Sequence, residues 1–221
     1  MLERFLGHAP SLTLNKHTLD IHPYTRKLSL GYYDKNSQWM PVYYRSISEY
    51  IGHTKMPKNI VEIIQTNNYQ LIEVGGGLAE LAPSVAKGAI TKPIVIDPLD
   101  YKSIQTLLER ARKKNICDDN IKLIDILLDR VAMYLDPNAI DLIPLSIQEA
   151  YLQYRERLKG VADVVVDVAG AIYYSGNLLN HKSVYELEKD WLVKQSPQGV
   201  FYTDQRWLNE IKHNHTRMSD I

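Results

Sequence analysis

The chain of 221 residues is long enough for one domain with a complete hydrophobic core and a small cap. Its 26 basic and 26 acidic side chains cancel, so no overall field draws it to nucleic acid or to an anionic membrane. The single cysteine, Cys117, excludes an internal disulfide and a cysteine cluster for a metal, and no run is apolar over the length of a membrane span. We therefore expect a cytoplasmic protein without a metal site or a membrane partner.

Residues 1–66 form the first predicted unit, a helical and aromatic cap or lid over a domain of residues 67–221. The cap is rich in tyrosine and histidine, which bury apolar area while their polar ends stay hydrated. Residues 41–47 fit a short strand or the first turn of a helix, and residues 59–65 are predicted to be helical. The alternative is a packing cap without ligand contact.

Residues 69–101 contain the pattern on which the functional prediction depends. The apolar run YQLIEV predicts a strand, and it leads directly into three glycines at residues 75–77. Helical spacing over residues 78–88 predicts a helix, and residues 93–96 predict a second strand that stops at Asp97. Together they form one βαβ unit with the layout of a nucleotide-binding fold.

Each part of this unit has a physical role at a ligand site. Glycines let the backbone turn sharply and approach a ligand, because no Cβ intervenes. A helix that begins behind them directs free N–H groups and the positive end of its dipole at the ligand. Asp97, at the tip of the second strand, can accept hydrogen bonds from two ribose hydroxyls. The alternative is a tight turn that is glycine-rich for packing alone.

The charges near the glycines distinguish between cofactors. A dinucleotide fingerprint needs a third small residue where this chain has Glu80, whose charge would repel a pyrophosphate. Glu73, two residues before the first glycine, favours a cationic ligand instead. The run Glu-Val-Gly-Gly-Gly-Leu-Ala at residues 73–79 resembles motif I of the class I S-adenosylmethionine-dependent methyltransferases, with Ala79 in place of the usual last glycine.

The resemblance implies an α/β fold of the Rossmann type, with a mostly parallel open sheet and helices on both faces. It also implies S-adenosylmethionine as the cofactor and in-line methyl transfer. The neutral overall charge favours a small-molecule acceptor over nucleic acid. Two residues of the cap, Tyr43 and Arg45, are candidates for binding the carboxylate of the cofactor. The full set of cofactor-binding candidates is Glu73, Gly75, Gly76, Gly77, Asp97, Pro98, Ser146, Ile147, Asp167, Val168, Tyr43 and Arg45.

The elements after Asp97 begin with two helices. Asp100 or Ser103 can cap the first helix, and residues 118–135 form a second amphipathic helix that is an insertion relative to the shortest methyltransferase pattern. Residues 139–145 predict the third strand. Pro144 places this strand at an edge of the sheet, because proline cannot donate a ladder hydrogen bond.

The next elements place a carboxylate at the centre of the sheet. Ser146 and Glu149 form a capping box for a helix that runs through residue 158, and this capping is the alternative to an adenine contact for Ser146. Residues 161–168 predict a central strand. Asp167, near its exit, must be hydrogen-bonded or lie close to the cofactor to be tolerated there.

The C-terminal part departs from the family pattern. Ser183 and Glu186 predict another capping box, residues 193–202 the fifth strand, and Asp204 the start of a last helix. The family sheet normally has two further strands, so we expect a shortened edge. Either the chain belongs to a longer protein, or the cap supplies a strand, or a homodimer covers the edge.

Catalysis by this family needs positioning more than acid–base chemistry, because the sulfonium is already a reactive methyl donor. A base is required only if the acceptor must lose a proton. The candidates are Asp167, His53, Tyr32, Tyr33 and Tyr173. Two other functions stay open: a non-catalytic scaffold or regulatory protein that binds S-adenosylmethionine, and an oxidoreductase that uses NAD or FAD.

Overall fold

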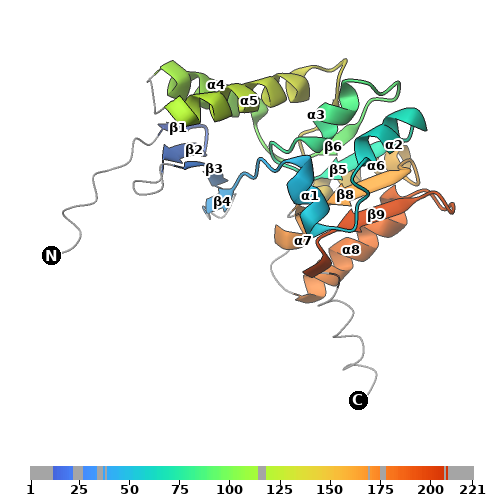
Figure 1. Ribbon diagram of the computed structural model, residues 1–221. Helices are drawn as coiled ribbons and strands as arrows, with labels where there is room; N and C mark the ends of the chain where they lie inside the picture. The colour runs from blue at the N-terminus through green and yellow to red at the C-terminus, as the bar shows by residue number, and fades with distance from the viewer. Residues whose placement is uncertain are drawn as a thin grey trace.

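The computed structural model describes residues 12–21, 27–33, 37, 39–113, 118–168, 170–174, 178–206 and 208. The chain forms a five-stranded sheet flanked by helices and a separate four-stranded sheet near the N-terminus (Figure 1). A parallel sheet with helices on both faces confirms the predicted α/β class.

The five-stranded sheet is parallel throughout, with the strand order β7-β6-β5-β8-β9. Its strands are β5 (Leu71–Val74), β6 (Ile94–Ile96), β7 (Asp141–Ile143), β8 (Val164–Asp167) and β9 (Val200–Thr203). Every residue of β5, β6 and β8 is buried, which explains their nearly continuous apolar sequences. β7 lies at an edge as predicted, and Pro144 follows its last residue.

The side chains of successive strand residues enter two core layers. Leu71 and Val164 belong to the layer covered by α3, α4 and α5. Ile72 and Val165 belong to the opposite layer, covered by α6 and α8. The helices are α1 (Ile47–His53), α2 (Ile60–Thr66), α3 (Leu81–Ala86), α4 (Tyr101–Lys113), α5 (Asp118–Leu135), α6 (Ile147–Leu158), α7 (Ala171–Tyr174) and α8 (Leu178–Leu192).

The N-terminal part differs from the predicted helical cap. β1 (Leu12–Leu14), β2 (His17–Ile21), β3 (Leu28–Tyr33) and β4 (Trp39–Pro41) form an antiparallel sheet in that order. The turn between β1 and β2 has positive φ at both central residues, as tight hairpins require. β1 and β2 pack on α4. Among the described residues before β5, the helices are α1 and α2, the latter where a helix was predicted.

Several predicted boundaries need correction. The helix after the glycines begins at Leu81 rather than residue 78 and has six residues. α8 begins at Leu178, so Ser183 lies inside the helix and does not cap it. The capping box of Ser146 and Glu149 is confirmed, whereas most of the helix predicted after Asp204 lies outside the described residues.

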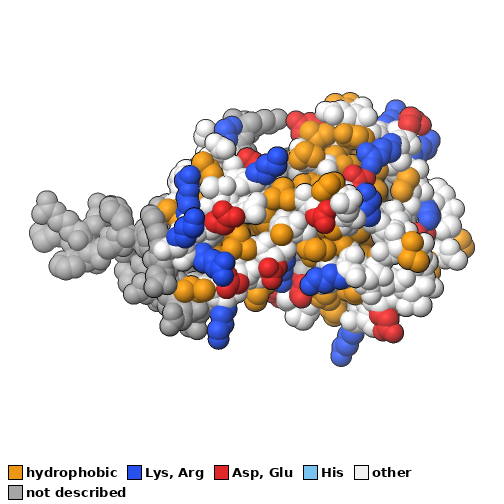
Figure 2. All heavy atoms as spheres, turned by 90° about the horizontal axis from the view of Figure 1, so that it is seen from above, with side chains coloured by type: hydrophobic (Ala, Val, Ile, Leu, Met, Phe, Trp, Pro, Cys, Tyr) orange, Lys and Arg blue, Asp and Glu red, His pale blue; other side chains and the backbone are white. Residues whose placement is uncertain are grey.

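The surface agrees with the balanced composition. On the face seen from above in Figure 2, acidic and basic side chains are interspersed with hydrophobic ones, so the described part of this face has no continuous basic patch. In the part of the chain that the structure describes, no helix is both long and apolar enough to cross a bilayer. β9 forms one end of the sheet, and a homodimer at that edge stays a prediction.

Candidate functional site

A cavity of about 170 Å³ lies at the carboxyl ends of β5 and β6, where open parallel sheets bind ligands. Residues of the small sheet, the glycine loop and the loop before α7 also line it. The predicted site residues that line this cavity are Tyr32, Tyr43, Gly75, Gly77, Asp97, Pro98, Ser146 and Ile147. Its lining does not include Glu73, Gly76, Asp167, Val168, Arg45, Tyr33 or His53, and the side chain of Tyr173 lies outside the described part of the chain.

Two glycines of the loop are required by neighbouring backbone. Gly75 and Gly77 have φ of 60° and 63°, a region that strongly favours glycine. A Cβ on Gly75 would lie 2.5 Å from the Cα of Gly170, and one on Gly77 would lie 2.5 Å from the carbonyl oxygen of Tyr43. The glycines therefore allow close packing within the protein, in addition to forming one wall of the cavity.

The backbone N–H groups of the loop are largely used inside the protein. Gly75 donates to the carbonyl of Ile96 at 2.8 Å. Residues 42–46, between β4 and α1, form a segment that we call the cap segment. Leu78 and Glu80 donate to two of its carbonyls, those of residues 43 and 45, at 2.7 and 2.9 Å. The predicted row of free N–H groups behind the glycines is therefore wrong for these positions, because the cap segment runs alongside the loop and accepts their hydrogen bonds.

Asp97 is the carboxylate that reaches the cavity. It is 2% exposed and accepts hydrogen bonds from the N–H groups of Gly77 at 2.8 Å and Leu99 at 3.0 Å. Burial raises its pKa from 3.8 to about 7, although these hydrogen bonds favour the anion. The Tyr101 side chain also favours the anion. A carboxylate has about four lone-pair sites, so these neighbours leave part of its accepting capacity for a ligand.

Glu73 does not line the cavity, and its carboxylate has partners inside the protein in place of the predicted contact with a cofactor. Its side chain is fully buried and accepts a hydrogen bond from the Tyr50 hydroxyl at 2.6 Å and one from the Ala82 N–H at 3.2 Å. Burial raises its pKa from 4.5 to about 7. Gly76 lies over this carboxylate, where a Cβ would come within 2.7 Å of it, so Gly76 also packs internally.

Two buried tyrosines donate hydrogen bonds to carbonyls of the glycine loop, a feature that the sequence did not lead us to predict. Tyr101 donates to the carbonyl of Gly77 at 2.8 Å, and Tyr134 donates to the carbonyl of Ala79 at 3.1 Å. The rings of Tyr101 and Tyr134 stack with centroids 4.7 Å apart. Both tyrosines fall on the apolar faces of α4 and α5, and this helical spacing is the available signal for their burial.

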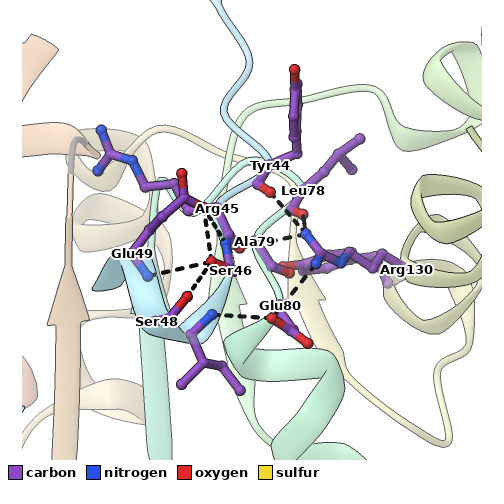
Figure 3. A network of polar contacts seen from close by, with 11 residues as sticks. Tyr44, Arg45, Ser46, Ser48, Glu49, Leu78, Ala79, Glu80 and Arg130 are labelled. Atoms are coloured by element: carbon purple, nitrogen blue, oxygen red, sulfur yellow. Dashed lines mark hydrogen bonds and ion pairs between the residues drawn. The ribbon is translucent and has the colours of Figure 1, made fainter. Parts of the chain in front are cut away.

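Arg130 of α5 joins the cap segment to the glycine loop (Figure 3). One guanidinium nitrogen donates to the carbonyls of Tyr44 and Leu78, both at 2.9 Å. The other lies 3.7 Å from the carboxylate of Glu80. The helix predicted as an insertion, α5, therefore supplies the residue that links the cap segment to the glycine loop. An arginine among apolar residues of an amphipathic helix is a weak sequence signal, and it was not identified as a site residue.

Asp167 and Val168 have internal partners rather than positions in the cavity wall. The Asp167 carboxylate accepts hydrogen bonds from the N–H groups of Gly170 at 2.9 Å and Ile172 at 3.0 Å, and so fixes the turn into α7. Burial raises its pKa from 3.8 to about 6. The carbonyl of Val168 accepts a hydrogen bond from Arg45 at 3.3 Å.

The two cap candidates for a cofactor carboxylate form a stacked pair. The Arg45 guanidinium lies 4.5 Å from the centroid of the Tyr43 ring. Tyr43 lines both the cavity beside the glycines and a second cavity next to it, whereas Arg45 lines the second cavity, together with His53. Of the two candidates, the first cavity therefore has Tyr43 but not Arg45 in its lining.

The far end of the first cavity is apolar. Pro98 and Ile147 line it as predicted, together with Leu99, which sequence reasoning missed. Ser146 also lines it, but its hydroxyl and N–H contact the Glu149 carboxylate at 2.6 and 3.0 Å. Helix capping therefore accounts for Ser146, and the flat apolar walls come from its neighbours.

Among the described residues, no group of three histidine, cysteine, aspartate or glutamate side chains is placed to hold a metal ion. The chain matches no known family model, no curated protein and no solved structure.

Proposed function

We propose that the protein is an S-adenosylmethionine-dependent methyltransferase that acts on a small molecule. The observation that carries the proposal is the combination in one cavity of a glycine loop, whose N–H groups are mostly bonded within the protein, and a buried carboxylate, Asp97. The cofactor contains no phosphate, so it needs a closely approaching loop without needing free N–H groups.

The same observation disfavours a dinucleotide. A pyrophosphate is normally bound by several N–H groups at the start of a helix. In this chain Leu78 and Glu80 already donate to the cap segment, and the N–H of Ala82 donates to Glu73. A diphosphate would also lie close to Asp97, whose charge would repel it.

The residues that line the cavity match the parts of the proposed cofactor. Asp97 would accept the two ribose hydroxyls, and the apolar walls formed by Leu99 and Ile147 suit an adenine ring. The glycine loop and Gly170 would lie along the amino-acid part. When bound, the cofactor supplies an electrophilic methyl group, and the protein's own task is to orient the acceptor and exclude water.

Calorimetry tests the proposal. The full chain should bind S-adenosylhomocysteine and S-adenosylmethionine and should not bind NADH. Asp97→Asn should weaken S-adenosylhomocysteine by about tenfold or more, because two charge-assisted hydrogen bonds are lost, at about 1.4 kcal/mol for each factor of ten. Asp100→Asn is the matched control, since Asp100 caps α4 through Ser103 and does not line the cavity. Tight binding of NADH, together with no binding of S-adenosylhomocysteine, would refute the proposal.

A non-catalytic protein that binds the same cofactor is the second candidate. The observation that favours it is the end of the third strand, where Ser146 stands in place of the acid common in the family and its hydroxyl and N–H contact the Glu149 carboxylate. A methyl-release assay separates the two functions: binding without release of a methyl group to any acceptor would support the non-catalytic protein.

A further inference from the structure

Glu188 carries a carboxyl group in the apolar layer between the sheet and α8. It lies one helical turn from Val184 and one from Trp191, and both of these belong to the core layer that α8 covers. The residue is 0% exposed, and among the described residues neither of its carboxyl oxygens has a hydrogen-bond partner. An isolated carboxylate at such a position is so costly that the group requires a nearby cation or a bound proton.

Asp167 is the carboxylate that faces Glu188 from the sheet. Asp167 and Thr203 are register partners on β8 and β9, and alternation from Val165 and Phe201 directs both side chains toward α8. Burial, then the charge of Asp167 and a hydrogen bond with it, raise the pKa of Glu188 well above its ordinary 4.5. Because ionised carboxylates only accept hydrogen bonds, a bond between these two groups requires a proton on one of them.

The backbone determines which of the two carboxyl groups holds that proton. The Asp167 carboxylate already accepts hydrogen bonds from the N–H groups of Gly170 at 2.9 Å and Ile172 at 3.0 Å, and both bonds favour its anion. No backbone N–H of the described residues donates to Glu188. The proton therefore belongs on Glu188, and its hydroxyl donates to the ionised Asp167.

The groups of β9 and of the residues after it do not replace this proton. The Thr203 hydroxyl is buried without a hydrogen-bond partner among the described residues, and it carries no charge. The next residue, Asp204, is paired with His53 at 3.3 Å and with Arg206 at 2.6 Å. The two cations nearest in sequence and in the sheet are therefore bound to a different carboxylate.

The cations of the two helices on this face are also directed elsewhere. On α6, the Arg155 guanidinium lies 5.3 Å from the centroid of the Tyr151 ring. On α8, the Lys189 ammonium is 6.0 Å from the centroid of the Tyr185 ring. The side chains of residues 173–182, which include the end of α7, lie outside the described part of the chain. Within the described part, Asp167 is the charged group that acts on Glu188.

The turn that Asp167 fixes is also a wall of the first cavity. Gly170 and Ala171 line that cavity between β8 and α7. Gly170 packs against Gly75 of the glycine loop so closely that neither position has room for a Cβ. A change in the bonding of Asp167 would therefore move residues on two sides of the cavity.

We propose that Glu188 is a positioning residue for the ligand cavity: it holds a proton that it donates to Asp167, and this bond fixes the turn whose Gly170 and Ala171 form one wall. Two carboxyl groups that share one proton carry a single negative charge between them, which removes most of the cost of burying both. The effect of this pair on S-adenosylhomocysteine rests on the proposed function, whereas the proton and the turn do not.

Infrared difference spectroscopy of the full chain tests the proton directly. At pH 8, wild type minus Glu188→Gln should show the C=O stretch of a protonated carboxyl group. Glu73 and Asp97, with pKa values of about 7, are mainly ionised at this pH and cancel in the difference. Glu186→Gln, an exposed glutamate on the same helix, is the matched control and should keep the band. A difference spectrum without this band would overturn the proposal.

Amide hydrogen exchange tests the turn. In Glu188→Leu, which has similar volume but no donor, the protection factors of the Gly170 and Ile172 N–H groups should fall by about tenfold relative to amides of β5. Glu188→Gln should retain them within about twofold, because its amide can donate to Asp167 as the protonated acid does. In wild type, but not in Glu188→Gln, these factors should also fall as rising pH ionises Glu188. Equal protection in the leucine and glutamine variants would show a packing role alone and overturn the positioning role.

A bound cation is the other way to neutralise the pair, and urea unfolding distinguishes it. Potassium, magnesium or calcium chloride should change the midpoint of wild type no more than that of Glu188→Gln. A cation-specific rise that is lost in both Glu188→Gln and Thr203→Val would replace the proton by a metal ion and overturn the proposal.

Calorimetry with S-adenosylhomocysteine connects the turn to the cavity. Glu188→Leu should weaken binding by about tenfold, whereas Glu188→Gln should stay within about twofold of wild type. Unchanged affinity in Glu188→Leu, despite lower protection of the turn, would overturn the positioning role. Absence of binding in wild type would instead refute the proposed function, while the infrared and exchange results still decide the proton and the turn.

Discussion

Glu73→Gln tests the internal role of this carboxylate through the pH dependence of stability. Burial raises the pKa of Glu73 from its ordinary 4.5 to about 7 in the folded protein. An acid with a raised pKa binds more protons when folded than when unfolded, in the window between these two values. The free energy of unfolding therefore falls as pH rises from 4.5 through 7, because an increasingly ionised unfolded chain competes with a folded state that resists ionisation.

The size of the effect follows from the two pKa values. A change from 4.5 to about 7 corresponds to roughly 3 kcal/mol, at about 1.4 kcal/mol for each pH unit. Glutamine cannot ionise, so this loss should be absent from the variant. The amide also places an N–H₂ group near the N–H of Ala82, or turns it toward the Tyr50 hydroxyl, at a cost of about 1–3 kcal/mol. That cost does not depend on pH, so it cancels in the comparison.

Urea unfolding of wild type and Glu73→Gln at pH 5, 6, 7 and 8 is the assay. The difference in free energy of unfolding between the two proteins should shift by roughly 2.5 kcal/mol in favour of the variant between pH 5 and 8. Glu62→Gln, an exposed glutamate on α2, controls for the loss of one surface carboxylate. Parallel curves for wild type and Glu73→Gln would refute the buried position of the carboxylate and restore Glu73 as a candidate for ligand contact.

Three other predictions follow from the loop and its surroundings. Arg130→Met should lower the free energy of unfolding by about 2–4 kcal/mol in urea, because three backbone carbonyls lose a charged donor. Gly77→Ala should lower the free energy of unfolding by more than about 2 kcal/mol, since the added Cβ would meet backbone at 2.5 Å and the φ of this residue is positive. Gly52→Ala is the control: its Cβ would meet nothing within 4 Å, so the free energy of unfolding in urea should rise by about 0.5–1 kcal/mol. S-adenosylhomocysteine should bind about tenfold more weakly at pH 6 than at pH 8, because the ribose hydroxyls favour the anion of Asp97, whose pKa is about 7. Binding should therefore release a proton, which calorimetry in buffers of different ionisation enthalpy would detect.

The five-stranded sheet could be predicted from the sequence because burial on both faces leaves a simple pattern. The residues of β5 and β8 form nearly continuous apolar runs, in which Glu73 and Asp167 are the exceptions, and each run ends at a polar or glycine-rich loop. Pro144 predicted an edge position for β7, because proline has no N–H to donate to a neighbouring strand. These signals are local, so they need no knowledge of neighbouring elements.

The small sheet gave a much weaker signal. β1 and β4 have three residues each, too few for the alternation of apolar and polar residues in a strand to be recognised. The tyrosines near them suggested a cap, but aromatic side chains are equally common in strands. The hairpin turn at Asn15 and Lys16 lacks the glycine that usually marks such a turn, although asparagine tolerates positive φ.

The residues of the site were easier to predict than their orientations. Strand ends in a parallel sheet converge at one edge, so Asp97 and the glycines were correctly brought together. Glu73 illustrates the limit: alternation along β5 places it on the same side as Leu71, toward the layer covered by α3, α4 and α5. Its position near the glycines suggested a ligand contact, whereas the alternation correctly indicates burial beneath the loop.

The carboxyl ends of the central strands concentrate negative charge, which bears on the choice of ligand. Glu73, Asp97 and Asp167 are buried there, and their raised pKa values of about 7, 7 and 6 show that ionisation is costly in the protein alone. A cation bound nearby would lower those pKa values and recover part of that cost, whereas a phosphate would raise them further. A cofactor with a sulfonium and an ammonium group therefore fits the electrostatics of this edge better than a dinucleotide does, independently of the geometry of the glycine loop.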